Sequence, residues 1–265
     1  MNDPADHPGK PRCEREAQVR CESRLSEVDV DTIQQPEHVV ILANGLWEDC
    51  EQIRRSACAA DIVVAADGAW AKARRLGIDV DLVVGDLDSL DEAGLEQLIA
   101  STVPVKRFSV DKDRTDTEIA VDLALEWNAR WITVCGVGGG RIDHALAHVF
   151  LLGKRPVTGS REMRLELAIG RETVIWVEGE IDLEGALPGD RVSLIPVDHC
   201  VRVSTWGLRF PLSDELLVRT AARGISNVVC TLPARVRISE GAAIMIHEAT
   251  ADRTQADCSC GRCDD

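Results

Sequence analysis

Five short apolar runs, rich in β-branched residues, recur through the first half of this 265-residue chain and constrain its fold strongly. Each run is followed by a polar or Gly/Asp-containing loop and then by an amphipathic stretch. Strands that are apolar throughout and alternate with helices form parallel sheets covered on both faces. The runs are 39–43, 62–66, 82–84, 103–108 and 131–135. We therefore predict an α/β N-terminal domain with a mostly parallel sheet and helices on both faces.

The pattern changes after a basic, glycine-containing connection at residues 153–161. Short runs of alternating polarity follow, separated by turn residues such as Gly185 and Gly189, and convincing helix is scarce. This pattern is typical of an antiparallel sandwich or barrel. The runs are 164–169, 173–177, 191–196, 201–204, 234–239 and 242–247. We therefore predict that an all-β antiparallel sandwich domain follows the first domain.

Both ends of the chain are polar and lack a sustained apolar period, which predicts a flexible arm and a loose tail. The tail carries Cys258, Cys260 and Cys263, which could bind a soft metal but lack a clear fourth ligand. The predicted division is a flexible arm at 1–36, an α/β domain at 37–159, a β-sandwich domain at 160–248 and a polar tail at 249–265.

Composition excludes several classes of protein. The formal net charge is −15, so nucleic acid and anionic membranes would be repelled. The apolar runs are far shorter than the roughly 20 residues that cross a bilayer, and the N-terminus has no apolar signal core. We expect a cytoplasmic protein with neither a nucleic-acid nor a membrane partner.

Ligands of open parallel sheets bind at the carboxyl ends of the strands, so the loops there are the candidate sites. Asp67 and Gly68 follow the second run, although Asp67 is equally well explained as the N-cap of a helix at 69–76. Asp86 and Asp88 follow the third run and point the same way if strand geometry continues through Leu87. Two such carboxylates suit Mg²⁺, although a solvated turn explains them as well.

The loop before the helix predicted at 119–127 is rich in charge. Thr115 and Glu118 have capping-box spacing, which accounts for Glu118 and for the neighbouring Asp116. It does not account for Asp111 and Asp113, which flank Lys112. That mixed-sign group is suited to holding a metal while touching a phosphate oxygen.

A glycine-rich loop lies between the fifth run and an apolar helix predicted at 145–152. Gly138, Gly139 and Gly140 let a backbone approach an anion closely, and Arg141 can fork onto phosphate oxygens. A flexible turn with Asp143 as the helix cap is the structural alternative. Together, the acidic loops and this glycine-rich loop predict a site for a Mg²⁺–nucleotide complex and phosphoryl transfer.

These loops, in this order, resemble the successive motifs of the thiamine pyrophosphokinase family. The matching stretches begin at Asp67, at Leu76, at Asp111 and at Gly139, and three more lie at 192–196, 205–212 and 224–227. The resemblance covers roughly residues 38–248. It implies an ATP-binding α/β domain, a thiamine-binding β domain and a homodimer. It also implies transfer of the terminal diphosphate of ATP to the hydroxyethyl group of thiamine, which gives thiamine diphosphate and AMP.

The resemblance also assigns roles by matching position. Mg²⁺ would be held by Asp86, Asp88 and Asp113. The catalytic set would be Asp86, Asp88, Lys112, Asp113, Asp116 and Arg141. The nucleotide-binding set would be Asp67, Gly68, Asp111, Gly139, Gly140, Arg141, Asp143 and His144. Ser226 and Asn227 would contact thiamine.

One departure from the family pattern bears on the acceptor. Members often carry a residue after the Ser-Asn pair that closes the thiamine site, whereas this chain continues with Val228. The alternatives are therefore a pyrophosphokinase for another primary alcohol, such as 6-hydroxymethyl-dihydropterin, and a non-catalytic ligand-binding relative. The stretches at 205–212 and 224–227 favour thiamine.

Overall fold

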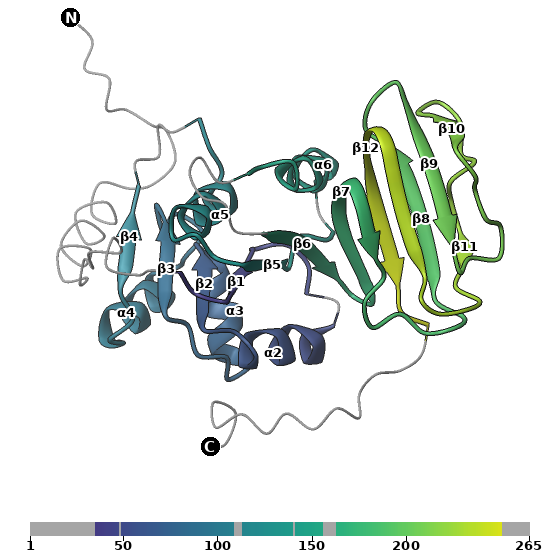
Figure 1. The fold of residues 1–265 in the computed structure, drawn as a ribbon. Coiled ribbons are helices and arrows are strands. Elements are labelled where there is room, and N and C mark those ends of the chain that lie inside the picture. The colour runs from purple at the N-terminus through teal and green to yellow at the C-terminus, as the bar shows by residue number, and fades with distance from the viewer. Residues whose placement is uncertain (1–34, 48, 109–112, 140, 156–162, 251–265) are drawn as a thin grey trace, which may run out of the picture.

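The computed structural model describes residues 35–47, 49–108, 113–139, 141–155 and 163–250 (Figure 1). The predicted arm and the cysteine tail lie outside these residues, apart from the short stretches 35–36 and 249–250. No helix within the described ranges is long and apolar enough to cross a membrane.

The first half forms the predicted parallel sheet. Its strands lie in the order β5-β1-β2-β3-β4, and every neighbouring pair is parallel. The strands are β1 (His38–Leu42), β2 (Ile62–Ala66), β3 (Leu82–Gly85), β4 (Val105–Arg107) and β5 (Trp131–Cys135). All five predicted runs contain strands. Four of these strands, β1, β2, β3 and β5, are buried almost throughout, as expected when both faces of a sheet are covered, whereas the edge strand β4 buries only Val105.

Helices cover both faces of this sheet (Figure 1). Apolar side chains of α2, α3 and α4 pack into the core on one face, and those of α5 and the end of α6 pack into the core on the other. The helices are α2 (Cys50–Cys58), α3 (Ala69–Arg75), α4 (Glu92–Ala100), α5 (Asp116–Glu126) and α6 (Ile142–Leu151). The predicted α/β architecture is confirmed in this half of the chain.

The ends of two of these helices follow from local sequence. The side chain of Thr115 caps α5 by accepting a hydrogen bond from the Glu118 N–H at 3.1 Å, as its spacing predicts. Helix α3 ends before Gly77, which has φ +65°. Because a side-chain cap contributes about 1 kcal/mol, the start of α5 is specified by its own residues.

The join between the two halves differs from the prediction. Strand β6 (Arg164–Ile169), expected among the antiparallel strands, pairs parallel with β5 and antiparallel with β7 (Glu172–Asp182). Hydrogen bonding therefore continues from the α/β half into the β half as one 12-stranded sheet. The domain boundary at residue 159 remains a prediction.

The remaining strands are antiparallel and enclose an apolar core of their own. The predicted runs 234–239 and 242–247 are one strand, β12, with an irregularity between Ile238 and Ala243. The strands β10 and β11 were not predicted. The strands of this part are β8 (Arg191–Pro196), β9 (Cys200–Trp206), β10 (Glu215–Val218), β11 (Asn227–Val228) and β12 (Arg235–Glu248).

Candidate functional site

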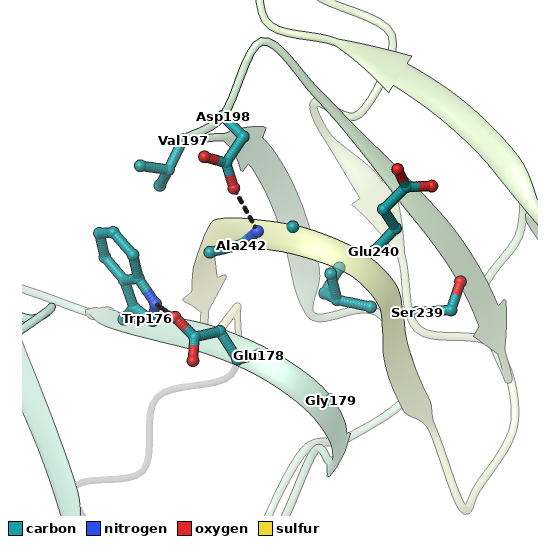
Figure 2. Close-up of a pocket in the computed structure, with 10 residues that line it drawn as sticks. Trp176, Glu178, Gly179, Val197, Asp198, Ser239, Glu240 and Ala242 are labelled. Carbon is teal, nitrogen blue, oxygen red and sulfur yellow. Dashed lines mark hydrogen bonds between the residues drawn. The ribbon is translucent and has the colours of Figure 1, made fainter.

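A hollow of about 460 Å³ lies in the β half, between β7, the β8–β9 turn and the irregular part of β12 (Figure 2). Its acidic side chains already have protein partners. The pairs are Glu178 with the Trp176 indole N–H at 2.7 Å, Asp198 with the Ala242 N–H at 2.8 Å, and Glu240 with Arg202 at 3.6 Å. The acidic side chains of this hollow therefore have structural roles, and the hollow is not the candidate functional site.

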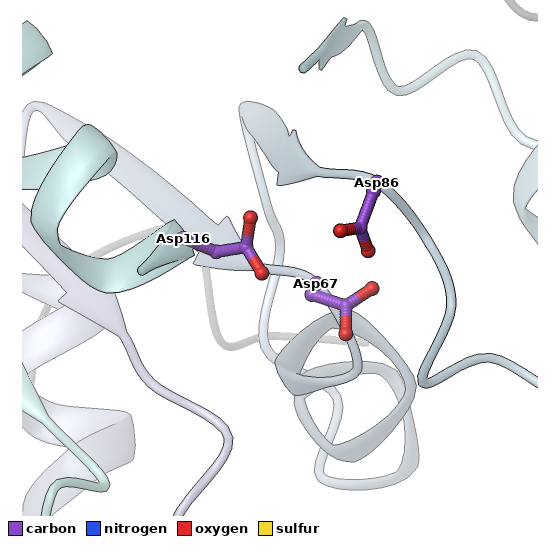
Figure 3. Close-up of side chains that lie close together, drawn as sticks. All are labelled: Asp67, Asp86 and Asp116. Atoms are coloured by element: carbon purple, nitrogen blue, oxygen red, sulfur yellow. The ribbon is translucent and has the colours of Figure 1, made fainter. Parts of the chain in front are cut away.

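Three aspartates converge where the parallel strands end (Figure 3). Asp67 follows β2, Asp86 follows β3 and Asp116 opens α5, and one carboxylate oxygen from each lies within 4.8 Å of the others. At that separation two carboxylates repel by roughly 3 kcal/mol at an effective dielectric constant of about 20. The fold thus holds together charges that would separate without a cation or protons.

Asp67 is the buried member of this carboxylate cluster, with 4% of its surface exposed. Burial raises the pKa of Asp67 above its usual value, and the nearby Asp116 and Asp86 raise it further, against hydrogen bonds that lower it. Its Oδ1 has no hydrogen-bond partner among the described residues. The N-cap of α3 is Gly68, without a side-chain cap, so the capping explanation of Asp67 is wrong.

The turn after β3 departs from the predicted strand geometry. Leu87 lies in the left-handed region, with φ +67°, so strand alternation does not relate Asp86 to Asp88. The Asp88 N–H instead donates to Asp86 Oδ1 at 3.2 Å. Leu87 is fully buried, and the roughly 2 kcal/mol gained by burying its side chain offsets the roughly 1–2 kcal/mol cost of the left-handed conformation.

Of the three predicted metal ligands, only Asp86 belongs to the carboxylate cluster of the described residues. Asp88 is an exposed neighbour, and its pKa is raised by partial burial and by the charges of Asp86 and Asp67. Asp113 is exposed at the start of the loop before α5. The other two members of the cluster are Asp67, which is predicted to bind the nucleotide, and Asp116, which is predicted to be catalytic.

The glycine-rich loop is held against the loop that follows β1. Backbone N–H groups of Gly45 and Leu46 donate to the carbonyl oxygens of Gly136 and Gly138, at 2.8 and 2.7 Å. A Cβ at Gly139, which has φ +70°, would lie 2.5 Å from the Leu46 Cβ. These glycines thus serve close approach between two backbone segments, in addition to any role with an anion.

Arg141 and Asp143 lie at the start of α6. Arg141 is the N-cap residue by position, and its guanidinium pairs with the Asp143 carboxylate through Nε and Nη2. The alternative explanation of Asp143 as the helix cap is therefore wrong. Both side chains are exposed, so the pair can exchange for a ligand at little energetic cost.

A cavity of about 320 Å³ connects the carboxylate cluster with the glycine-rich loop and α6. Asp67, Asp116, Gly139, Arg141 and His144, all predicted as site residues, line it. The other lining residues are Asn44, Gly45, Ala66, Ser89, Thr115, Thr117, Val137 and His148. Loops that are up to about a hundred residues apart along the chain thus meet around one space.

Several predicted site residues do not line this cavity or are not described. Those outside the described residues are Asp111, Lys112 and Gly140. Ser226 and Asn227 are in the β half and are not among the described residues that line the cavity. The Asn227 side chain bonds both backbone groups of Phe210, at 3.0 and 2.7 Å, which is a structural role.

Asn44 and His148 were missed as lining residues. Asn44 follows β1, so its place after a parallel strand is the same signal that indicates Asp67. Lys72 holds this loop in place, because its Nζ donates to the carbonyl oxygens of Asn44 and Gly45 at 2.9 and 2.8 Å. His148 lies in the second turn of α6 and carries no signal of this kind in the sequence.

The carboxylate cluster fits a divalent cation that prefers oxygen ligands. Three carboxylates from three elements converge, and the buried Asp67 Oδ1 lacks a hydrogen-bond partner in the described part of the chain. Mg²⁺ is commonly bound through one or two carboxylates together with substrate phosphates. The donor set is thus of the right kind for a Mg²⁺–nucleotide complex.

The burial of Asp67 predicts a pH-dependent stability effect for Asp67→Asn in metal-free protein. Because the folded pKa is raised above 3.8, the folded state binds the proton more tightly than the unfolded chain. Above the raised pKa, the buried charge of Asp67 therefore destabilises the folded wild-type protein. This destabilisation disappears as the pH falls and Asp67 is protonated. We expect Asp67→Asn to raise the thermal midpoint at pH 7, with the gain shrinking towards pH 4. A gain that is equal at both pH values would contradict this.

Comparison with known protein sequences finds relatives of this chain. Residues 53–162 match the family model described as "Thiamin pyrophosphokinase, catalytic domain". The thiamine pyrophosphokinase of Bacillus subtilis (strain 168) is 27% identical over 164 residues, which are 61% of this chain and 75% of that protein.

Solved structures with the same fold include the thiamine pyrophosphokinases of B. subtilis and Geobacillus thermodenitrificans. The first has a TM-score of 0.71 at 23% identity and covers 81% of this chain and 100% of its own. The second has a TM-score of 0.68 at 26% identity and covers 84% and 99%. The resemblance seen in the sequence is confirmed: residues 53–162 of this chain match the catalytic domain of the thiamin pyrophosphokinase family.

Proposed function

We propose that this enzyme transfers diphosphate from ATP to the hydroxyethyl group of thiamine and releases AMP, in a Mg²⁺-dependent reaction. The observation that carries the proposal is the meeting of the carboxylate cluster and the glycine-rich loop around one cavity. The named relatives, which are thiamine pyrophosphokinases, support it.

The reaction would be an in-line displacement at the β-phosphorus of ATP. The thiamine hydroxyl oxygen forms the new bond to phosphorus, the bond to the bridging oxygen of the α-phosphate breaks, AMP leaves and one proton is released. Such a reaction needs positioning and charge neutralisation more than covalent chemistry. Arg141 and Lys112 are the proposed cations that spread the developing negative charge, Arg141 after exchange from Asp143.

The carboxylate cluster would hold the metal. The candidate metal ligands that the structure brings together are Asp67, Asp86 and Asp116. Asp88 lies next to them, and Asp113 is a further proposed ligand. Bound Mg²⁺ would neutralise phosphate charge and orient the diphosphate. Asp67, Gly68, Asp111, Gly139, Gly140, Asp143 and His144 are the proposed nucleotide contacts beside Arg141.

The proposal of thiamine as the acceptor depends on the β half, where Ser226 and Asn227 are the proposed thiamine contacts. In this chain Asn227 holds the backbone of Phe210, and the Ser226 N–H donates to Ser193 Oγ at 3.0 Å. Because neither residue is among the described residues that line the cavity of its own chain, we propose that Ser226 and Asn227 of a second copy contact the thiamine bound at this cavity. A pterin alcohol is the alternative acceptor, and a non-catalytic relative is the alternative to an enzyme.

The experiment that tests the proposal measures AMP release from Mg²⁺-ATP. Thiamine, 6-hydroxymethyl-dihydropterin and no acceptor are compared with the same purified protein. We expect AMP release that depends on thiamine, with thiamine diphosphate as the second product. AMP with the pterin alone would overturn the acceptor, and a folded protein that releases no AMP in any of the three would overturn the transfer reaction.

The proposed homodimer has a candidate surface on α6. Ile142, Leu146 and Phe150 recur every four residues on this helix and are 74, 52 and 60% exposed. Such a stripe is costly to leave in water and is typical of an interface. We expect the double variant Leu146→Glu/Phe150→Glu to be monomeric by light scattering at concentrations where wild type is dimeric. Leu232→Glu, at a similarly exposed apolar position in the β half, is the matched control, and a double variant that stays dimeric would exclude this surface.

A further inference from the structure

His148 faces the candidate site from α6. It lies one turn beyond His144, with the two ring centroids 6.4 Å apart, and both line the cavity that Asp67 and Asp116 line. His148 is only 8% exposed, although neighbouring side chains of α6 are largely exposed. The helix therefore places one polar side chain, in a buried position, against the substrate cavity.

The imidazole of His148 has a hydrogen bond with the Val137 backbone, but its hydrogen-bonding capacity is not fully used by the described residues. Its Nδ1 is buried without a hydrogen-bond partner among the described residues. In contrast, His38 Nε2 lies 3.0 Å from Thr133 Oγ1, and His247 Nε2 lies 2.9 Å from Asp190 Oδ2. A buried polar atom without a partner costs about 1–3 kcal/mol, so its position is unfavourable unless a ligand supplies one.

The chemistry around His148 indicates which ligand group it would meet. Burial lowers the pKa of His148, and the neighbouring His144 lowers it further, against a hydrogen bond with the Val137 backbone that raises it, so the neutral ring prevails at pH 7. A neutral imidazole offers one donor and one acceptor, which matches a hydroxyl group. Phosphate oxygens are better matched by the guanidinium of Arg141, at the mouth of the same cavity.

We propose that His148 is a substrate-contacting residue of this cavity, whose imidazole hydrogen-bonds a hydroxyl group of the bound nucleotide or of the acceptor alcohol. The proposal rests on the transfer reaction proposed above and adds a contact that the sequence motifs did not indicate. It also accounts for the burial of an imidazole whose Nδ1 has no partner among the residues that the structure describes.

The test compares His148→Leu with His148→Asn, which keeps a hydrogen-bonding group. Both KM values, kcat and the thermal midpoint are measured, with His199→Leu, at an exposed turn, as the matched control. We expect His148→Leu to raise one KM about tenfold or more without lowering the thermal midpoint, because a buried polar group without a partner is removed. His148→Asn should restore part of the loss, and His199→Leu should match wild type.

The two sources of the hydroxyl group are separated by which KM changes. A raised KM for ATP would show that the hydroxyl group belongs to the nucleotide, and a raised KM for thiamine would show that it belongs to the acceptor. Kinetic constants within twofold of wild type, or a lowered thermal midpoint with normal KM values, would overturn the proposal. Wild type is assayed in the same series, so its failure to release AMP refutes the transfer reaction instead.

A second measurement covers the case in which His148→Leu does not fold. Ring nitrogen NMR signals of ¹⁵N-histidine-labelled wild type are recorded with ATP alone, with thiamine alone and without either. The His148 signal is identified by its loss in His148→Asn. A shift of this signal with one of the two substrates is expected, and its invariance with both under saturating conditions would overturn the contact.

Discussion

Asp116→Asn is expected to lower kcat by roughly a thousandfold and to leave the protein more stable than wild type in the absence of metal. Asp116 supplies one of three carboxylates whose oxygens lie within 4.8 Å of one another. Losing a group that neutralises or orients a developing phosphate charge typically costs two to three orders of magnitude. Removing one negative charge from the cluster relieves repulsion in the folded state.

The opposite signs of these two effects make the prediction specific. Turnover is measured with saturating Mg²⁺-ATP, and the thermal midpoint is measured in EDTA. Asp79→Asn, at an exposed aspartate before β3, is the matched control and should change neither quantity. A folded Asp116→Asn protein with near-normal turnover would remove Asp116 from the site.

Gly85→Ala is expected to lower turnover about a hundredfold, because it disturbs the spacing of the same carboxylates. A Cβ at this position would lie 3.0 Å from the Asp67 Cβ and 3.2 Å from the Asp116 Cγ. Gly85 also has φ +151°, a conformation that L side chains rarely adopt. The substitution should therefore cost roughly 1–3 kcal/mol of stability as well.

Gly77→Ala separates backbone strain from the effect on the carboxylates. Gly77 has φ +65°, and no atom of the described residues lies within 4 Å of a Cβ built there. We expect Gly77→Ala to lower the thermal midpoint while turnover stays at the wild-type level. If both glycine variants lose turnover in proportion to stability, the close contact of Gly85 with Asp67 and Asp116 has no functional role.

Much of the first half could be predicted because its signals are local. The apolar runs that form β1, β2, β3 and β5 are buried on both faces of a sheet, and the Thr115 cap is specified by residues three apart. The polar loops after β2, β3 and β5 could be found because the carboxyl ends of parallel strands meet at one edge. These features depend on sequence neighbours or on a general property of the fold class.

The β half was harder to predict because its pairing is not local. Runs 164–169 and 173–177 look alike in sequence, yet β6 extends the parallel sheet while β7 begins the antiparallel part. The runs around 238 and 243 are separated by a turn-like Glu-Gly pair, but β7 pairs with both and keeps them in one strand. Which edge a strand joins depends on partners many residues away.

The sequence by itself determined the alternation of strands and helices, the start of α5 and the loops in which the acidic residues lie. Only the tertiary structure decided that, within the described residues, the carboxylates that converge with that of Asp86 are those of Asp67 and Asp116. The reason is physical. The buried Leu87 turns the chain after β3 out of strand geometry, and Gly85 leaves room for two carboxylates from other elements. Spacing along the chain can place charges in one loop, but the distances between loops depend on how the strands and helices pack.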